Sequence, residues 1–225
     1  MSHFSIAIDG PSGAGKSTLA KALAEARGYL YVDTGAIYRT LGLYAVQKGI
    51  APTDHEGVLG LLDSVQIALQ HGSDGLQHML LCGEDVTEKI RENAISAAAS
   101  AVSAYPEVRA FLMETQRRLA AENNVVMDGR DIGTVVLPDA NVKIFLTAVP
   151  EARARRRYEE LLQRGQQVDY DTVLRDLNQR DYNDTHRATA PLRQGDDAVL
   201  VDTTDLTLAE SLAALQKAVE GRLGE

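Results

Sequence analysis

The first residues of the chain contain a spacing of glycine, lysine and serine that could bind phosphate. Gly10, four residues of any type, Gly15, Lys16 and Ser17 fit the phosphate-loop pattern, between an apolar run and a helical pattern. The glycines let backbone amides converge on the phosphates of a nucleotide. Lys16 is expected to reach the terminal phosphates, and the Ser17 hydroxyl to ligate magnesium. A glycine-rich turn with a chance lysine is the alternative. The predicted loop comprises Gly10, Pro11, Ser12, Gly13, Ala14, Gly15, Lys16, Ser17 and Thr18.

A second motif with chemical potential is "VVMDGRDIGT" at residues 125–134. Asp128 ends an apolar strand, where an acidic residue of a phosphate-loop protein often lies near the magnesium, here through water. Arg130 and Asp131 then bring a cation and a hydrogen-bond acceptor into the same cleft. The motif therefore predicts a second set of polar groups beside the phosphate loop.

A third motif, "DTGAIYR", follows a predicted strand at 29–32. Thr34 is expected to cap the helix that begins there, because threonine is a favoured N-cap residue. Tyr38 and Arg39 lie four and five residues further on, within reach of the space before the helix. A capped helix with an exposed arginine is the alternative.

An arginine-rich helix is predicted at 151–165. Arg153, Arg156 and Arg157 share one face of this helix by their spacing. Close cations repel one another unless an anion joins them, which favours a triphosphate as ligand. A solvated charged helix is the alternative.

A second charged helix is predicted within 178–192. Arg180, Asp184 and Arg187 recur at intervals of four and three, so they are expected to line one helix face. That face offers two arginines for phosphate and one carboxylate that can accept hydrogen bonds from sugar hydroxyls. Salt bridges within the helix are the alternative.

A mainly parallel sheet is the element that could position these motifs. Strands are predicted at four apolar runs, residues 4–8, 125–127, 142–146 and 199–201. Helical patterns separate most of these runs, which indicates an α/β fold whose ligands gather beyond the carboxyl ends of the strands. An apolar stripe at 208–219 predicts a C-terminal helix packed on the core.

Residues 58–104 interrupt this alternation of strands and helices. An alternating pattern at 65–69, the turn residues "HGSDG" and a return strand at 76–81 predict a hairpin. Thr87 is then expected to cap an alanine-rich helix. We interpret the segment as a small inserted lobe, with an ordinary crossover as the alternative.

Composition narrows the class of protein. The 225 residues suit one domain, with or without an insertion, and the net charge of −9 argues against a general nucleic-acid or membrane-surface binder. Cys82 is the single cysteine, so an intrachain disulfide or a cysteine-rich metal site is excluded. The first strand begins almost at Met1, and no apolar run approaches the roughly 18 residues that span a bilayer. We therefore expect a soluble cytoplasmic protein.

Together, "DGPSGAGKST", "DTGAIYR", "DGRDIGT", "VKIFL" and "DTHRATAPL" resemble the bacterial cytidylate kinases of the nucleoside monophosphate kinase family, over nearly the whole chain. The resemblance implies a P-loop NTPase fold in a single domain at 1–225, with an inserted monophosphate-binding lobe at about 58–104 and a mobile helical lid at about 151–167. It further implies phosphoryl transfer from ATP, with Mg²⁺, to CMP or dCMP, by a monomer that binds neither nucleic acid nor membrane. Either Ser17 or Thr18 could serve the magnesium, and His186 has no assigned role.

The resemblance also implies roles for individual side chains. The expected catalytic residues are Lys16, Arg130, Arg153 and Arg157, of which the last two belong to the lid. The expected substrate-binding residues are Thr34, Tyr38 and Arg39 in the monophosphate site, Arg130 and Arg187 on the acceptor phosphate, Ser100, Arg109 and Asp131 on cytosine, and Arg180 and Asp184 on the sugar. The Asp131 carboxylate can accept from the amino group of cytosine, whereas it would repel the carbonyl that uracil carries there.

Two rival functions lead to different expectations. A kinase that phosphorylates the alcohol group of a small metabolite would favour a general base and would not need Arg39, Arg130 and Arg187 around a second phosphate. A nucleotide-dependent switch would favour a separate base-recognition motif, such as Asn-Lys-x-Asp, which this sequence lacks.

Overall fold

The computed structural model describes residues 3–72 and 77–223. It contains two compact units, Met1–Tyr31 with Ala120–Glu225, and Val32–Leu119, which we describe one at a time. The bounds expected for an inserted lobe at 58–104 and a lid at 151–167 stay predictions. Within the described ranges, no helix combines the length and the apolar character needed to cross a membrane.

The first unit is built on a five-stranded sheet in the order β2-β6-β1-β7-β8. The strands are β1 (Ser5–Asp9), β2 (Leu30–Asp33, where the second unit begins), β6 (Val125–Gly129), β7 (Val142–Thr147) and β8 (Val199–Asp202). β1 pairs in parallel with β6 and β7, and β7 pairs in parallel with β8, which confirms the predicted strands and sheet. All of β6 is buried, because helices cover such sheets, and its first three residues, 125–127, are accordingly apolar.

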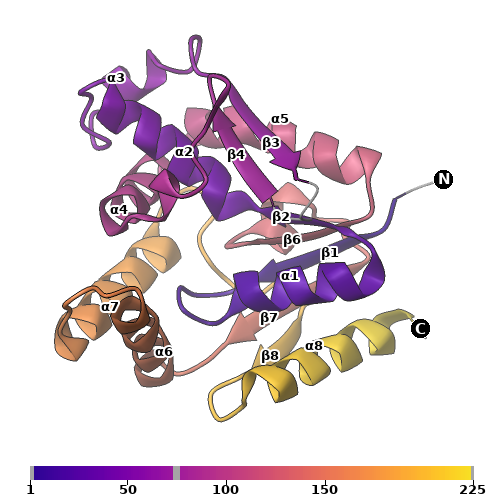
Figure 1. The fold of residues 1–225 in the computed structure, drawn as a ribbon. Helices are drawn as coiled ribbons and strands as arrows, with labels where there is room; N and C mark the ends of the chain where they lie inside the picture. The colour runs from indigo at the N-terminus through magenta and orange to yellow at the C-terminus, as the bar shows by residue number, and fades with distance from the viewer. Residues whose placement is uncertain (1–2, 73–76, 224–225) are drawn as a thin grey trace. The chain divides into compact units, whose positions relative to one another are not determined.

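Helices α1 (Lys16–Arg27) and α8 (Leu208–Leu223) pack against each other and against this sheet (Figure 1). Leu19 and Leu23 of α1 and Leu215 and Val219 of α8 are buried and share one apolar core with the strands. The predicted packing of the C-terminal helix is therefore confirmed. The core fixes α1, and with it the loop that precedes α1.

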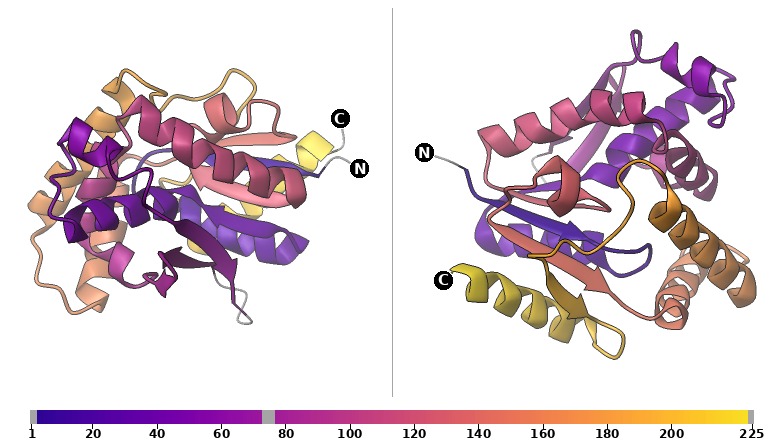
Figure 2. Two further views of the ribbon diagram at one scale, coloured as in Figure 1. Left: turned by 90° about the horizontal axis from the view of Figure 1, so that it is seen from above. Right: turned by 180° about the vertical axis from the view of Figure 1, so that it is seen from behind.

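The first unit also contains the helix pair α6 (Pro150–Gln163) and α7 (Tyr170–His186), which lie against each other (Figure 2). A small apolar cluster around Ala154, Leu161 and Val173 joins them. Asp169 caps α7, because its side chain accepts a hydrogen bond from the Thr172 backbone amide at 3.0 Å. Between β6 and β7 the chain forms a π-helical turn, η2 (Ile132–Val136).

The second unit contains helices and a small antiparallel sheet in the order β3-β4-β5. Its elements are α2 (Thr34–Gln47), α3 (His55–Leu59), β3 (Ile67–His71), β4 (Gln77–Leu81), β5 (Glu84–Asp85), η1 (Lys89–Arg91), α4 (Asn93–Val102) and most of α5 (Pro106–Glu122). The predicted hairpin is confirmed by β3 and β4, while turn residues 73–75 and Leu76 lie outside the described residues. Helices α2 and α4 approach closely at Gly42, where a Cβ would lie 3.0 Å from the Ala99 nitrogen.

The prediction that Thr87 caps the alanine-rich helix is wrong. Helix α4 begins only at Asn93, without a capping side chain. The Thr87 hydroxyl instead donates to Asp85 Oδ1 at 2.6 Å and accepts from the Met79 amide at 2.9 Å. The Thr87 hydroxyl therefore bonds to β4 and β5 and not to a helix.

Candidate active site

The predicted phosphate loop joins the carboxyl end of β1 to the start of α1. Two of its glycines cannot be replaced without strain: a Cβ on Gly10 would lie 1.9 Å from the Leu146 carbonyl oxygen, and Gly13 has a φ of 74°. Gly15 is the N-cap of α1 and has no side chain that could accept from the first turn. The first backbone N–H groups of α1 are therefore donors suited to an anion.

Lys16 is a buried cation within this loop. It is 6% exposed, and its Nζ donates to the Pro11 carbonyl at 2.7 Å. Burial, followed by the charge of Arg130, lowers the pKa of Lys16 to about 7, and the carboxylate of Asp128 offsets this only in part. A bound phosphate would favour the charged form of the lysine.

The structure brings together Ser17 and Asp128, the two predicted metal ligands. Ser17 Oγ donates to Asp128 Oδ2 at 3.0 Å, and the Tyr31 hydroxyl donates to Asp128 Oδ1 at 2.9 Å. Hydroxyl and carboxylate oxygens are ligands that Mg²⁺ favours, so the pair fits this metal. Sequence reasoning missed Tyr31, because no local spacing relates it to Asp128.

The structure pairs Arg130 with Asp184. Arg130 Nε donates to Asp184 Oδ2 at 2.8 Å, and Asp184 is 5% exposed. Burial alone would lower the pKa of Arg130, but the charge and hydrogen bond of Asp184 outweigh it and raise this pKa. For the carboxylate of Asp184 burial acts in the opposite direction and would raise the pKa, but the charges of Arg130 and Arg180 keep this pKa below its usual value. Both groups are therefore charged at neutral pH.

A second pair joins Asp131 to Arg187. Arg187 Nη2 donates to Asp131 Oδ1 at 3.2 Å, and its Nε donates to the Ala190 carbonyl at 2.8 Å. The prediction that Arg187 continues the face of Arg180 and Asp184 is wrong, because α7 ends at His186 and Arg187 has extended backbone angles. Tertiary folding, and not helical spacing, brings Arg187 to Asp131.

Arg153 of α6 is connected to the phosphate loop through an aspartate of α7. Arg153 Nη1 donates to Asp181 Oδ2 at 2.6 Å and to the Ser12 carbonyl at 2.9 Å. Asp181 Oδ1 in turn accepts from the Ser12 amide at 3.3 Å. Asp181 is a residue that sequence reasoning missed, and its carboxylate here accepts from a loop amide that could serve a phosphate.

The neighbouring arginines of α6 have different protein partners from Arg153. Arg156 donates to the hydroxyl of Thr203 at 3.1 Å and also to its carbonyl. Arg157 donates to Glu160 at 2.8 Å, one turn along the same helix. Each of the three guanidiniums thus has a protein acceptor of its own, and the expectation that Arg153, Arg156 and Arg157 act as one anion-binding face stays a prediction.

In the second unit, Asp33 and not Thr34 caps α2. Asp33 Oδ1 accepts from the Ala36 amide at 2.9 Å, whereas Thr34 is already the first helical residue. Asp33 Oδ2 also accepts from Arg39 Nη2 at 2.8 Å, so this arginine is not a freely exposed one. The Gln77 amide holds Asp33 in turn, since its Oε1 accepts from the Asp33 N–H at 2.8 Å.

The same unit connects Tyr38, Ser100 and Arg109. The Arg109 guanidinium carbon lies 5.7 Å from the centre of the Tyr38 ring, a cation–π distance. Arg109 Nη1 donates to the Ser103 carbonyl at 3.4 Å, and the Ser103 hydroxyl donates to the Ser100 carbonyl at 2.9 Å. Arg109 is only 2% exposed. A buried arginine is therefore fixed beside an aromatic ring.

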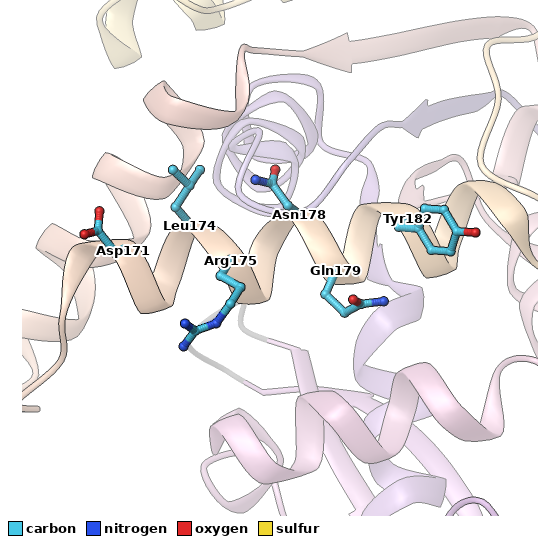
Figure 3. A pocket seen from close by; sticks show the side chains of 6 residues that line it. All are labelled: Asp171, Leu174, Arg175, Asn178, Gln179 and Tyr182. Carbon is cyan, nitrogen blue, oxygen red and sulfur yellow. The ribbon is translucent and has the colours of Figure 1, made fainter.

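A pocket runs along α7 outside these clusters. Its six lining side chains all come from α7 (Figure 3): Asp171, Leu174, Arg175, Asn178, Gln179 and Tyr182. None of them belongs to the predicted site residues of that helix, Arg180 and Asp184. Of the features described, the phosphate loop and its charged pairs are the better candidate for a site of reaction.

Comparison with known proteins shows the family of this chain. The family model described as cytidylate kinase matches residues 6–220. A cytidylate kinase from Caldicellulosiruptor saccharolyticus is 50% identical over 220 residues, which cover 98% of this chain and 96% of the relative. One from Carboxydothermus hydrogenoformans is 50% identical over 210 residues, which cover 93% and 94%.

Among solved structures, an uncharacterized protein from Eubacterium ventriosum has the same fold. The TM-score is 0.54 at 15% identity, and the match covers 97% of this chain and 99% of the other. The glycine-rich loop between a central parallel strand and a helix makes this a P-loop NTPase fold. With a family match over nearly its whole length and relatives that share half of its residues, this chain belongs to the cytidylate kinase family.

Proposed function

We propose that the chain transfers the γ-phosphoryl group of ATP to CMP, giving ADP and CDP, and that it accepts dCMP as well. One observation carries the proposal beyond family membership. The charges of Arg130 and Asp184 both act on the pKa of Lys16, the phosphate-loop lysine, so this arginine–carboxylate pair lies near it. Such a concentration of buried cations beside a phosphate loop suits a reaction between two phosphates.

The donor side of the proposed site is the phosphate loop. The backbone N–H groups of the loop at Gly10 to Thr18, in which Pro11 has none, and the ammonium of Lys16 would hold the ATP phosphates. Ser17 would ligate Mg²⁺ and Asp128 would hold it through water, and the ion would neutralise charge that develops on the transferred group. Arg153 and Arg157 are proposed to act from a lid at 151–167.

The acceptor side combines the two arginine–carboxylate pairs of the first unit. Arg130 and Arg187 would bind the CMP phosphate, which each can do while keeping its carboxylate partner, because a guanidinium has five N–H donors. Asp184, with Arg180, would bind the sugar. Asp131 would accept a hydrogen bond from the cytosine amino group and so favour cytosine over uracil.

Further acceptor-binding residues are proposed in the second unit. Its candidate residues share aromatic, hydroxyl or guanidinium groups: Thr34, Tyr38, Arg39, Ser100 and Arg109. Two contacts support this proposal. The capping carboxylate of Asp33 holds Arg39, and the ring of Tyr38 lies beside the guanidinium of Arg109. Both arginines are thus pre-oriented, which reduces the entropy lost when a phosphate or a base binds.

The proposed reaction needs no general base. An oxygen of the CMP phosphate, already an oxyanion, forms a bond to the γ-phosphorus while the bond from this phosphorus to the β–γ bridging oxygen breaks, and ADP leaves with that electron pair. Lys16, Arg130 and Arg153 would stabilise the charge of the transferred group, so catalysis consists of positioning and electrostatics.

A panel of acceptors tests the proposal. ADP formation from Mg·ATP is followed with CMP, dCMP, UMP, AMP and no acceptor, and the diphosphate product is identified by mass. We expect turnover to depend strongly on CMP or dCMP. ADP release without any acceptor, or no turnover with any monophosphate, would refute the function.

A further inference from the structure

Asp9 is a buried carboxylate to which the proposed reaction assigns no role. It ends β1, directly before Gly10, and is 5% exposed. Its Oδ1 accepts from the Ile132 backbone N–H at 2.8 Å, and its Oδ2 accepts from the Gly133 backbone N–H at 2.8 Å. One carboxylate thus binds two consecutive amides at the start of η2.

These amides follow directly on Asp131. The Asp131 carbonyl, which belongs to the same peptide group as the Ile132 N–H, accepts from the amides of Val135 and Val136, at 2.9 and 3.1 Å. The peptide group that follows Asp131 is therefore held at its oxygen by the helical turn and at its N–H by the carboxylate of Asp9. Because the first amides of a helical turn have no partner within it, a buried turn of this kind needs an external acceptor.

We infer that Asp9 is a positioning residue for base recognition: by holding the amides of Ile132 and Gly133, it sets the direction in which the Asp131 carboxylate points. The inference rests on the proposed function, in which Asp131 reads the cytosine amino group. Asp9 itself does not touch the substrate. Its contribution is to hold, from β1, the turn that carries the Asp131 carboxylate.

The electrostatics of Asp9 support this arrangement. Burial raises the pKa of Asp9 to about 6, the two backbone hydrogen bonds oppose this effect, and the nearby charge of Asp131 adds to it. The carboxylate is therefore shielded from water, so water cannot easily replace it as the acceptor for the two backbone N–H groups. Loss of its hydrogen bonds would leave two buried N–H groups unsatisfied, and the turn would shift to find other acceptors.

The donor loop should be less affected than the recognition turn. Gly10 is held independently, because its backbone lies directly against the Leu146 carbonyl of β7. A change at Asp9 should therefore alter recognition of the acceptor more than binding of ATP. This difference separates a positioning role from a general contribution to stability.

The test is Asp9→Asn, which keeps the shape but turns an NH₂ group toward one of the two amides. We expect the ratio of kcat/KM for CMP to that for UMP to fall about tenfold, through a higher KM for CMP, with little change in the KM for ATP. The matched control is Asp169→Asn, which alters another helix-start carboxylate of the same unit that also accepts from a backbone amide. The control should keep the wild-type ratio.

A measurement on the wild type keeps the inference testable if the variant does not fold. By NMR, the Ile132 and Gly133 amide protons should resonate downfield and exchange slowly, as expected for bonds to a buried carboxylate. Rapid exchange of both would overturn the inference. So would a folded, active Asp9→Asn protein with an unchanged CMP to UMP ratio, or an equal change in the control. A wild type without CMP-dependent turnover would instead refute the proposed function, and this inference with it.

Discussion

Replacing Lys16 with methionine should stabilise the empty protein while abolishing its activity. Methionine keeps an unbranched side chain of similar length but carries no charge. Lys16 is 6% exposed, and burial lowers its pKa from 10.5 to about 7. Below pH 7 the folded protein therefore carries a charge in a place that disfavours it, and a neutral side chain avoids that penalty.

The size of this effect depends on pH in a direction that follows from proton binding. The unfolded chain holds the Lys16 proton up to a pH near 10.5, whereas the folded chain releases it near pH 7. Raising the pH through this window therefore stabilises the wild type, by about 1.4 kcal/mol per pH unit. Between pH ~6.5 and ~9.5, the stability advantage of Lys16→Met should shrink by about 3 kcal/mol.

Urea unfolding of the wild type and of Lys16→Met across this pH range measures the difference directly. Lys21→Met is the matched control, because Lys21 is exposed on the same helix. An advantage of Lys16→Met that does not change with pH, or that changes equally in the control, would refute the reasoning. In the ADP assay, wild-type turnover by Lys16→Met would remove Lys16 from the proposed mechanism.

Three further substitutions test other parts of the site. Asp131→Asn should lower kcat/KM for CMP by about tenfold or more while UMP loses less, because an amide can donate to the uracil carbonyl; equal losses in parallel assays would contradict base recognition. Asp33→Ala should destabilise the protein by about 1 kcal/mol in urea unfolding through loss of the α2 cap, and should raise the KM for CMP because Arg39 loses its partner; an unchanged KM would separate Arg39 from acceptor binding. Gly10→Ala should yield no folded protein by circular dichroism, since its Cβ would meet the Leu146 carbonyl oxygen at 1.9 Å; a cooperative thermal transition like that of the wild type would contradict this.

Local patterns in the sequence predicted the elements well. The strands of the main sheet and the glycine-rich loop were predictable, because buried parallel strands are short apolar runs and a phosphate loop needs glycines at fixed spacing. Caps were less predictable. Asp33 and Thr34 are both good N-cap residues, and only the hydrogen bond to the Ala36 amide shows which of them caps α2.

Partners of charged side chains could not be predicted from spacing. Helical periodicity placed Arg187 on a face with Asp184, but the helix ends one residue before Arg187 and the chain then turns toward Asp131. Spacing also could not predict the partner of Arg156, because Arg156 donates to Thr203, which lies 47 residues further along the chain. Asp181 was missed because its partners, Ser12 and Arg153, are distant in sequence. Such pairs exist only once the sheet has formed.

The order of strands also has a consequence for how this chain can fold as it is synthesised. The strand that leads into the phosphate loop is made well before its partners: the Phe4 amide donates to Asn124, 120 residues further on, and β1 pairs with β6 and β7. At about 5–20 residues per second, the ribosome needs roughly 6 to 24 s to supply that partner. The second unit, by contrast, is one continuous segment and can fold during that wait. The apolar strand β1 must therefore avoid non-native pairing until β6 has been synthesised, so β1 is the segment for which a nascent-chain chaperone should matter most.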